Sequence, residues 1–158
     1  FHSINEATRT DRENTLTSQW MEIVGVRNVS AGEELSALEG KSYAGLEQIY
    51  LWDPQVIVCN EPGVPEYIRT DAKWAALSAV KNDKVYQMPI GISRWGHPGS
   101  AETPLAIYWL GKLIYPELYE DINVEQKAME FYRTFFHYEL TEQDLFGMMS
   151  GERMRTAQ

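Results

Sequence analysis

Apolar and polar residues follow one another along this chain with two different periods. Apolar side chains three or four positions apart predict helices, because such residues share one helix face. This period covers residues 15–24, 45–52, 64–69, 102–115, 124–138 and 141–149, and Asp71 is placed to cap one more helix. Runs of β-branched or alternating apolar residues predict buried strands over 55–59 and 84–88, and residues 1–4 are expected to end a further strand.

Polar and turn-forming residues separate these elements. Residues 5–14 are polar, residues 60–63 contain Pro and Gly, and residues 89–99 are too rich in Gly and Pro for a helix or a strand. We therefore expect loops in all three places. Gly25 and Pro116 are expected to end the helices that precede them.

The order of the predicted elements indicates the fold class. Strands that are separated by helices pair in parallel through right-handed crossovers, which places helices on both faces of a sheet. We therefore predict an α/β fold with three α/β/α layers and a mostly parallel central sheet. The sequence contains no internal repeat and no low-complexity tract.

Composition and charge narrow the class of protein. The chain has 158 residues, 44% of them apolar, and a formal net charge of −9, which fits one globular domain. The negative charge opposes binding to nucleic acid or anionic lipid and favours partners with basic surfaces. No apolar run has the length of a membrane span. Because the chain starts at Phe1 and not at Met, we expect it to be part of a longer protein.

The sequence lacks the usual motifs of catalytic and metal sites. It has no nucleophile elbow and no phosphate-binding glycine loop, and its three histidines, His2, His97 and His137, lack metal-ligand spacing. Its single cysteine, Cys59, lies in a predicted strand and is expected to be a buried core residue. We therefore predict no catalytic residue, no metal ligand and no cofactor.

Candidate ligand-binding residues gather in the three predicted loops. In open α/β sheets, ligands bind beyond the carboxyl ends of the strands, where these loops are expected to lie. Guanidinium groups beside an aromatic face suit an anionic or partly planar ligand. Trp95 could instead fill the core, Arg94 could be a surface residue, and His97 could stabilise its own loop. The candidates are Arg9, Arg12, Asn60, Glu61, Arg94, Trp95 and His97.

Four segments together resemble a known family. They are Leu46–Val58 with Trp52-Asp53-Pro54, Trp74–Tyr86 with Leu77-Ser78-Ala79-Val80, Trp109–Glu117 with Tyr115-Pro116, and Phe131–Phe136. In this order and spacing they resemble the C-terminal half of ABC-transporter substrate-binding proteins of the ferric-siderophore and cobalamin type. The resemblance covers most of the chain, from about residue 20 to about residue 145.

The resemblance implies an architecture and a set of roles. Residues 1–150 would be the C-terminal lobe of a two-lobed, helix-linked binding protein, and residues 151–158 a frayed tail. The loops with Arg94–His97 and with Arg9 and Arg12 would face the ligand, and Glu47 would dock on an arginine of the ABC permease. An iron-siderophore complex is the expected ligand, and cobalamin, haem or molybdate are alternatives.

The same resemblance implies a location, and one rival class remains. The expected location is the periplasm or the outer face of the membrane, as a lipoprotein, with contact to the membrane only through the permease or a lipid anchor. The rival is an α/β enzyme or an interaction domain, which would need a nucleophile-base pair or a cofactor loop.

Overall fold

A computed structural model describes residues 4–152 of the chain. These residues form two compact units, each described by itself below. Unit 1 comprises the residues up to 19 together with 27–88, and unit 2 comprises 20–26 together with the residues from 89 onward. The predicted boundaries of one lobe at 1–150 and a tail at 151–158 stay a prediction.

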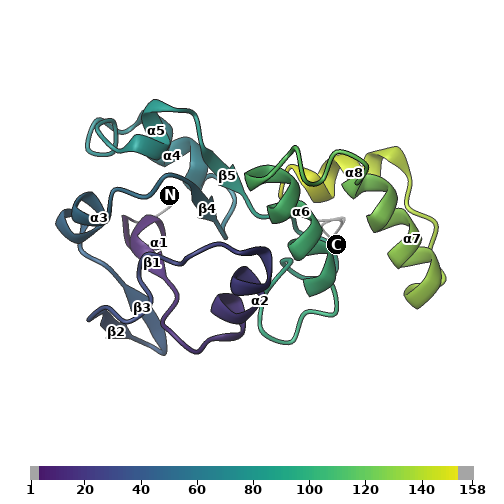
Figure 1. Cartoon of the computed structure of the whole chain (residues 1–158), viewed down its shortest axis with the longest axis horizontal. Coiled ribbons are helices and arrows are strands. Elements are labelled where there is room, and N and C mark those ends of the chain that lie inside the picture. The colour runs from purple at the N-terminus through teal and green to yellow at the C-terminus, as the bar shows by residue number, and fades with distance from the viewer. Residues whose placement is uncertain (1–3, 153–158) are drawn as a thin grey trace, which may run out of the picture. The chain divides into compact units, whose positions relative to one another are not determined.

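Unit 1 contains a small antiparallel sheet that the sequence patterns did not predict. Its strand order is β1 (Arg9–Thr10), β3 (Lys41–Tyr43) and β2 (Ser36–Leu38), and α1 (Ile4–Thr8) precedes it. The β2–β3 turn is the pair Glu39-Gly40, with φ of 50° and 74°, which is the two-residue geometry that suits a twisted hairpin. Figure 1 shows this hairpin with β1 beside it. The prediction of one loop over 5–14 was therefore wrong.

The prediction that residues 1–4 end a strand is wrong at its last residue. Ile4 lies in α1 and not in a strand, and the rest of that prediction, residues 1–3, lies outside the described residues.

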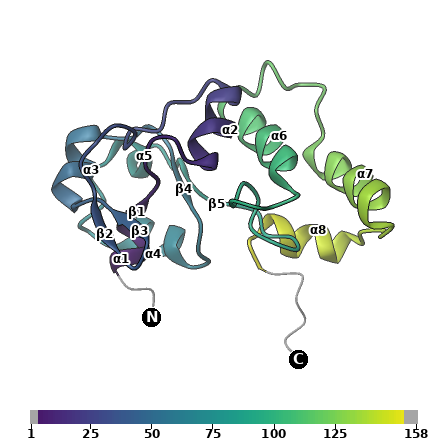
Figure 2. The same ribbon diagram turned by 90° about the horizontal axis from the view of Figure 1, so that it is seen from below.

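The second sheet of unit 1 confirms the α/β class with parallel pairing. Strands β4 (Ile57–Cys59) and β5 (Val85–Gln87) pair in parallel, with Val58 opposite Tyr86. They lie next to each other in both ribbon views (Figures 1 and 2). The helices of this unit are α3 (Leu46–Trp52), α4 (Val64–Thr70) and α5 (Ser78–Lys81).

The core of unit 1 lies around this parallel pair. Its buried residues include Ile68, Trp74, Leu77 and Val85, each exposed by 1% or less. Asp71 does not begin a helix, contrary to the prediction. It is the residue that ends α4, and its carboxylate accepts the backbone N–H of Lys73 in a turn.

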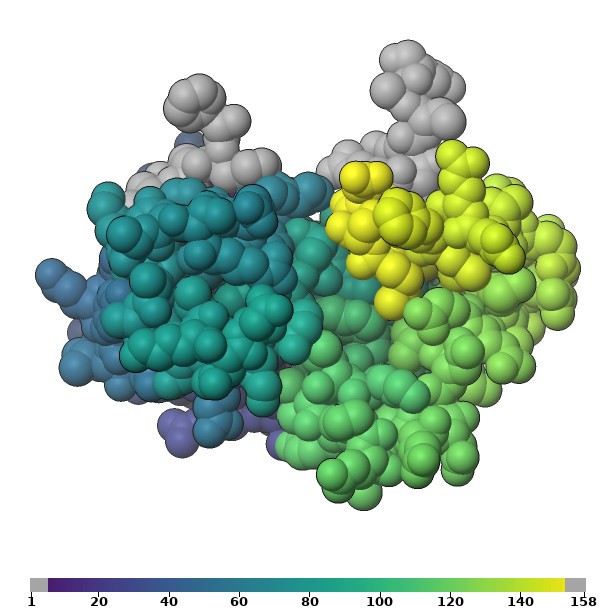
Figure 3. All heavy atoms as spheres, turned by 90° about the horizontal axis from the view of Figure 1, so that it is seen from above, coloured from purple at the N-terminus to yellow at the C-terminus, as the bar shows by residue number. Residues whose placement is uncertain are grey.

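Unit 2 is helical. Helix α2 (Leu16–Val24) continues into it from unit 1, and α6 (Thr103–Ile114), α7 (Val124–Phe136) and α8 (Glu142–Met149) follow. The last two helices form one continuous part of the surface of this unit in the space-filling view (Figure 3). These helices confirm the predicted ones, and Gly25, with φ of 80°, ends α2 as predicted.

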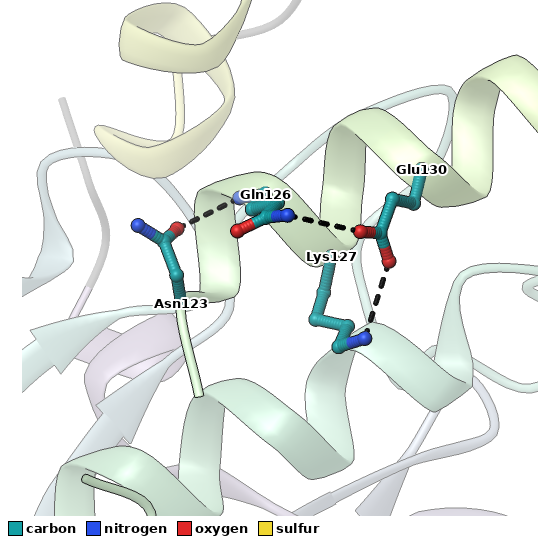
Figure 4. A network of polar contacts seen from close by, with 4 residues as sticks. All are labelled: Asn123, Gln126, Lys127 and Glu130. Carbon is teal, nitrogen blue, oxygen red and sulfur yellow. Dashed lines mark hydrogen bonds and ion pairs between the residues drawn. The ribbon is translucent and has the colours of Figure 1, made fainter. Parts of the chain in front are cut away.

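Local capping explains where the last two helices begin. The Asn123 side chain accepts the Gln126 N–H at 2.8 Å, and Lys127 and Glu130 form an ion pair one turn further on (Figure 4). Thr141 and Asp144 form a reciprocal capping box at the start of α8.

No helix within residues 4–152 has the length and apolar character needed to cross a membrane.

Candidate functional site

A basic pocket lies in unit 1, between the loop that follows β1 and the β2–β3 hairpin. Its volume is about 250 Å³. Arg9 and Arg12, both predicted ligand-binding residues, line it together with Lys41, and the lining also contains hydroxyl side chains and one carboxylate. The full lining is Arg9, Thr10, Asp11, Arg12, Thr15, Ala37, Gly40, Lys41 and Ser42.

Side chains from three places fix the backbone of the pocket loop. The Asp11 carbonyl accepts hydrogen bonds from Ser30 Oγ at 2.8 Å and from Asn28 Nδ2 at 3.1 Å. The Arg12 carbonyl accepts from Ser18 Oγ at 2.9 Å and from the Thr15 hydroxyl at 3.1 Å. Ser30 is completely buried. The loop is therefore held by its own unit before any ligand is bound, which lowers the ordering cost of binding.

The three cations of the pocket differ in their partners. Arg12 Nε donates to Ser42 Oγ at 2.8 Å, and among the described residues the Arg12 side chain makes no other hydrogen bond. Its two terminal nitrogens therefore remain available to a planar or tetrahedral anion. Arg9 and Lys41 each lie 3.5 Å from a carboxylate oxygen of Glu6. Arg12 is thus the cation that can engage an anion without first leaving a carboxylate.

Asn60 and Glu61 follow the carboxyl end of β4. Glu61 Oε1 lies 4.0 Å from Arg9 Nη1, so the two predicted ligand residues Arg9 and Glu61 form an ion pair with each other. Asn60 is half-buried in the same turn. The structure therefore brings Arg9, Arg12 and Glu61 to one region of unit 1.

The loop with the other three predicted ligand residues lies in unit 2, where a buried carboxylate organises it. Glu102 is 1% exposed. Its oxygens accept the backbone N–H groups of Ile92 and Ser93 at 3.3 and 2.8 Å, the Trp95 indole N–H at 3.2 Å, and the Tyr132 hydroxyl. Burial, and next the hydrogen bond to Glu102, raise the pKa of Tyr132 far above its ordinary value.

Trp95, a predicted ligand-binding residue, does not lie at an exposed position of this loop. Its side chain is fully buried, and its indole N–H reaches Glu102. The reason is the carboxylate seven residues later, which offers this polar edge a partner inside unit 2. In this arrangement Trp95 fills the core and its face is not available for stacking.

Arg94 and His97 remain closer to the surface. Arg94 is half-buried and His97 is exposed, and the His97 N–H donates to the Arg94 carbonyl at 3.1 Å. His97 therefore stabilises its own loop, which was the alternative to ligand binding, but it does so through its backbone N–H and not through its imidazole. The histidine at the end of α7, His137, is a helix-ending residue with φ of 52°.

Two glycines allow the close approaches in this loop. A Cβ on Gly91 would lie 2.0 Å from Glu102 Oε1, and a Cβ on Gly96, whose φ is 72°, would lie 2.6 Å from Trp20. The Trp20 indole N–H donates to the Gly96 carbonyl at 3.1 Å. Only glycine fits at both positions without displacing a buried side chain.

Sequence reasoning missed Lys41 and Ser42 in the pocket, Glu6 beside it and Glu102 in the loop. The first two lie on a hairpin that was not predicted. The signal for Glu102 was a single acid at the start of a predicted helix, which is normally a solvated residue. No group of three or more His, Cys, Asp or Glu that could hold a metal ion occurs among the described residues.

Two further predicted residues have clear positions. Glu47 is exposed in the first turn of α3, where it is accessible to a partner. Cys59 is a buried core residue, as predicted, and burial raises the pKa of its thiol to about 12.

The fold is that of part of a periplasmic solute-binding protein. A periplasmic solute binding protein from Veillonella parvula superposes with a TM-score of 0.77 at 28% identity, over 92% of this chain and 44% of that one. The chain is also 31% identical over 122 residues to the molybdate-binding protein MolA of Haemophilus influenzae, which is 76% of this chain and 34% of MolA. A structure of MolA bound to molybdate superposes with a TM-score of 0.73 at 29% identity, over 87% of this chain and 41% of MolA.

All of these relatives carry the names of solute-binding proteins, and MolA is the cognate periplasmic binding protein of an ABC transporter. The chain spans less than half the length of each of them. A scan against protein-family models finds no match.

Proposed function

We propose that this chain is the C-terminal lobe of the solute receptor of an ABC importer, and that it contacts a small anionic solute through the basic pocket of unit 1. The observation that carries the proposal is Arg12, which lines the pocket together with Arg9 and Lys41 and is held by Ser42 through its Nε. Guanidinium groups with free N–H donors bind oxyanions through charge-assisted hydrogen bonds.

The size of the pocket favours a small solute. Pockets for drug-sized molecules measure about 300–1,000 Å³, and this one is about 250 Å³. The relative that binds molybdate supports a tetrahedral oxyanion of that kind. An iron-siderophore complex, which the sequence resemblance put first, and cobalamin or haem are the competing outcomes. Arg94 and His97 remain proposed ligand contacts, and the burial of Trp95 removes it from the proposed site.

A binding panel tests the ligand. The full-length protein that contains this chain is titrated with molybdate, sulfate, a ferric siderophore, cobalamin and haem, and heat or fluorescence is recorded. We expect molybdate to bind, and Arg12→Gln to weaken binding at least about tenfold, because a charge-assisted hydrogen bond is lost. Lys84→Gln, which removes an exposed positive charge outside the pocket, is the matched control. Unchanged affinity of the Arg12 variant, or binding of only a large ligand, would contradict the proposal.

The proposed partner is the permease, and the proposed location is the periplasmic side of the membrane. Glu47 is exposed on α3 and would pair with a basic group of the permease. We expect Glu47→Arg to keep ligand affinity and to abolish stimulation of the transporter ATPase. Glu66→Arg makes the same charge change on the exposed face of α4 and is the control. Normal stimulation by the Glu47 variant would refute this docking role.

A further inference from the structure

Glu6 occupies an unusual position beside the basic pocket. It lies on α1 and places one carboxylate oxygen near each of two pocket cations. Oε2 is 3.5 Å from Arg9 Nη1, and Oε1 is 3.5 Å from Lys41 Nζ. Both distances exceed those of tight charge-assisted hydrogen bonds, which measure about 2.7–2.9 Å. Glu6 therefore attracts both cations without being locked in one geometry with either of them.

These three charged groups are partly shielded from water. The side chains of Glu6 and Arg9 are 24% and 26% exposed, and that of Lys41 is 40% exposed. Charges that are this far removed from water interact more strongly than fully exposed ones, since less solvent screens them. Arg9 also has Glu61 at 4.0 Å. Carboxylates of the protein itself therefore partly neutralise two of the three cations, Arg9 and Lys41.

We propose that Glu6 is an internal counter-ion that competes with the bound anion for Arg9 and Lys41, and so limits the affinity of the pocket. This inference rests on the proposed function, because it assumes an anionic ligand at that pocket. Arg12, which has no recorded carboxylate partner among the described residues, provides the constant part of the attraction. The attraction of Arg9 and Lys41 for the anion is smaller, because both cations also interact with Glu6.

The competition has a function in a transport receptor. A receptor must hold its solute and then release it to the permease. When the anion leaves, the Glu6 carboxylate can pair with Arg9 and Lys41 again, which lowers the free energy needed for release. Glu6 repels a bound anion and attracts the same two cations, and both effects oppose tight binding. Removing its charge should therefore tighten binding, which is the opposite of what loss of a ligand-contacting residue would do.

Equilibrium titration of the full-length protein with molybdate at low salt tests this. Low salt is used because ionic screening weakens such effects. We expect Glu6→Gln to bind about fivefold more tightly, the factor that corresponds to the upper end for a partly exposed charge pair. Glu13→Gln removes the same charge from an exposed residue of the pocket loop that has no ion pair among those recorded, and should stay within about twofold.

A second variant guards against a purely structural effect. Glu6→Asp keeps the negative charge on a shorter side chain, and we expect it to gain less affinity than Glu6→Gln. The thermal midpoint of each variant is recorded without ligand, so that a variant that fails to fold is identified and the aspartate variant then decides. Unchanged or weaker binding by both Glu6 variants would overturn the inference.

The Arg12 variant separates the two levels of the argument. If Arg12→Gln loses affinity while the Glu6 variants do not gain it, the pocket is the site and the counter-ion role is wrong. If Arg12→Gln binds normally, the proposed site itself is wrong, whatever the Glu6 variants do.

Discussion

Replacing Glu102 should destabilise unit 2 more than any other single change of an acidic residue in it. The side chain is 1% exposed and accepts hydrogen bonds from Ile92, Ser93, Trp95 and Tyr132. Glu102→Ala removes the acceptor of the Ser93 N–H, the Trp95 indole N–H and the Tyr132 hydroxyl and opens a cavity. The Ile92 N–H keeps the Tyr132 hydroxyl oxygen as an acceptor. Net hydrogen bonds to a charged group contribute about 1.5–3 kcal/mol each, and they do not add independently.

From this network we expect Glu102→Ala to lower the free energy of unfolding by about 3–5 kcal/mol, because several buried donors lose their acceptor at about 1–3 kcal/mol each and these losses do not add fully. Glu102→Gln keeps the volume and one acceptor oxygen, but its amide N–H₂ faces backbone N–H donors. We expect it to cost about 1–3 kcal/mol, which corresponds to one unsatisfied buried group.

Urea unfolding followed by tryptophan fluorescence measures both losses, and Trp95 reports directly because its indole contacts Glu102. Glu22→Ala on the exposed side of α2 is the control and should stay within about 0.5 kcal/mol of the wild type. Hydrogen exchange at the Ser93 amide should accelerate in the alanine variant. A loss below about 1 kcal/mol for Glu102→Ala would refute the assignment of this carboxylate as the organiser of the loop.

Three substitutions and one thiol-modification experiment test other features. Gly96→Ala should lower the free energy of unfolding by about 2–4 kcal/mol, because the residue has a left-handed φ and a Cβ would contact Trp20. Gly99→Ala, with φ of 85° and open space around it, should lower it by only about 1–2 kcal/mol. Thermal unfolding measures both losses. Asn123→Ala should cost about 1 kcal/mol through loss of the α7 cap, measured in the same way. Cys59 should react slowly with iodoacetamide at pH 8 until the protein unfolds, because burial raises the pKa of its thiol to about 12. The stability from that shift is complete below pH 9.0, the ordinary thiol value, and is lost as the pH rises toward about 12.

The α/β class and most helices followed from hydrophobic periodicity, but the small antiparallel sheet did not. Its strands are two or three residues long, and β2 is exposed throughout, so no alternation of buried and exposed positions marks it. Its turn, Glu39-Gly40, lacks the Asn-Gly pair that signals such hairpins most strongly. Lys41 and Ser42 were therefore not recognised beside Arg9 and Arg12.

The loop over 89–99 shows a different limit. Gly and Pro correctly indicated irregular backbone, but they did not indicate which side chain faces inward. The burial of Trp95 depends on Glu102 and Tyr132, which are contacts made in the folded unit and not in the local sequence. Only the tertiary position of Glu102 distinguishes it from an ordinary acid at a helix start.

A crystal structure of the full-length protein grown with molybdate would test the central claim most directly, because anomalous scattering from molybdenum locates the anion without ambiguity. The account predicts a peak in the pocket of unit 1, with anion oxygens within hydrogen-bond distance of the terminal nitrogens of Arg12 and near Lys41 and Ser42. A peak away from residues 9–15 and 37–42, or the absence of a peak at saturating molybdate, would contradict it.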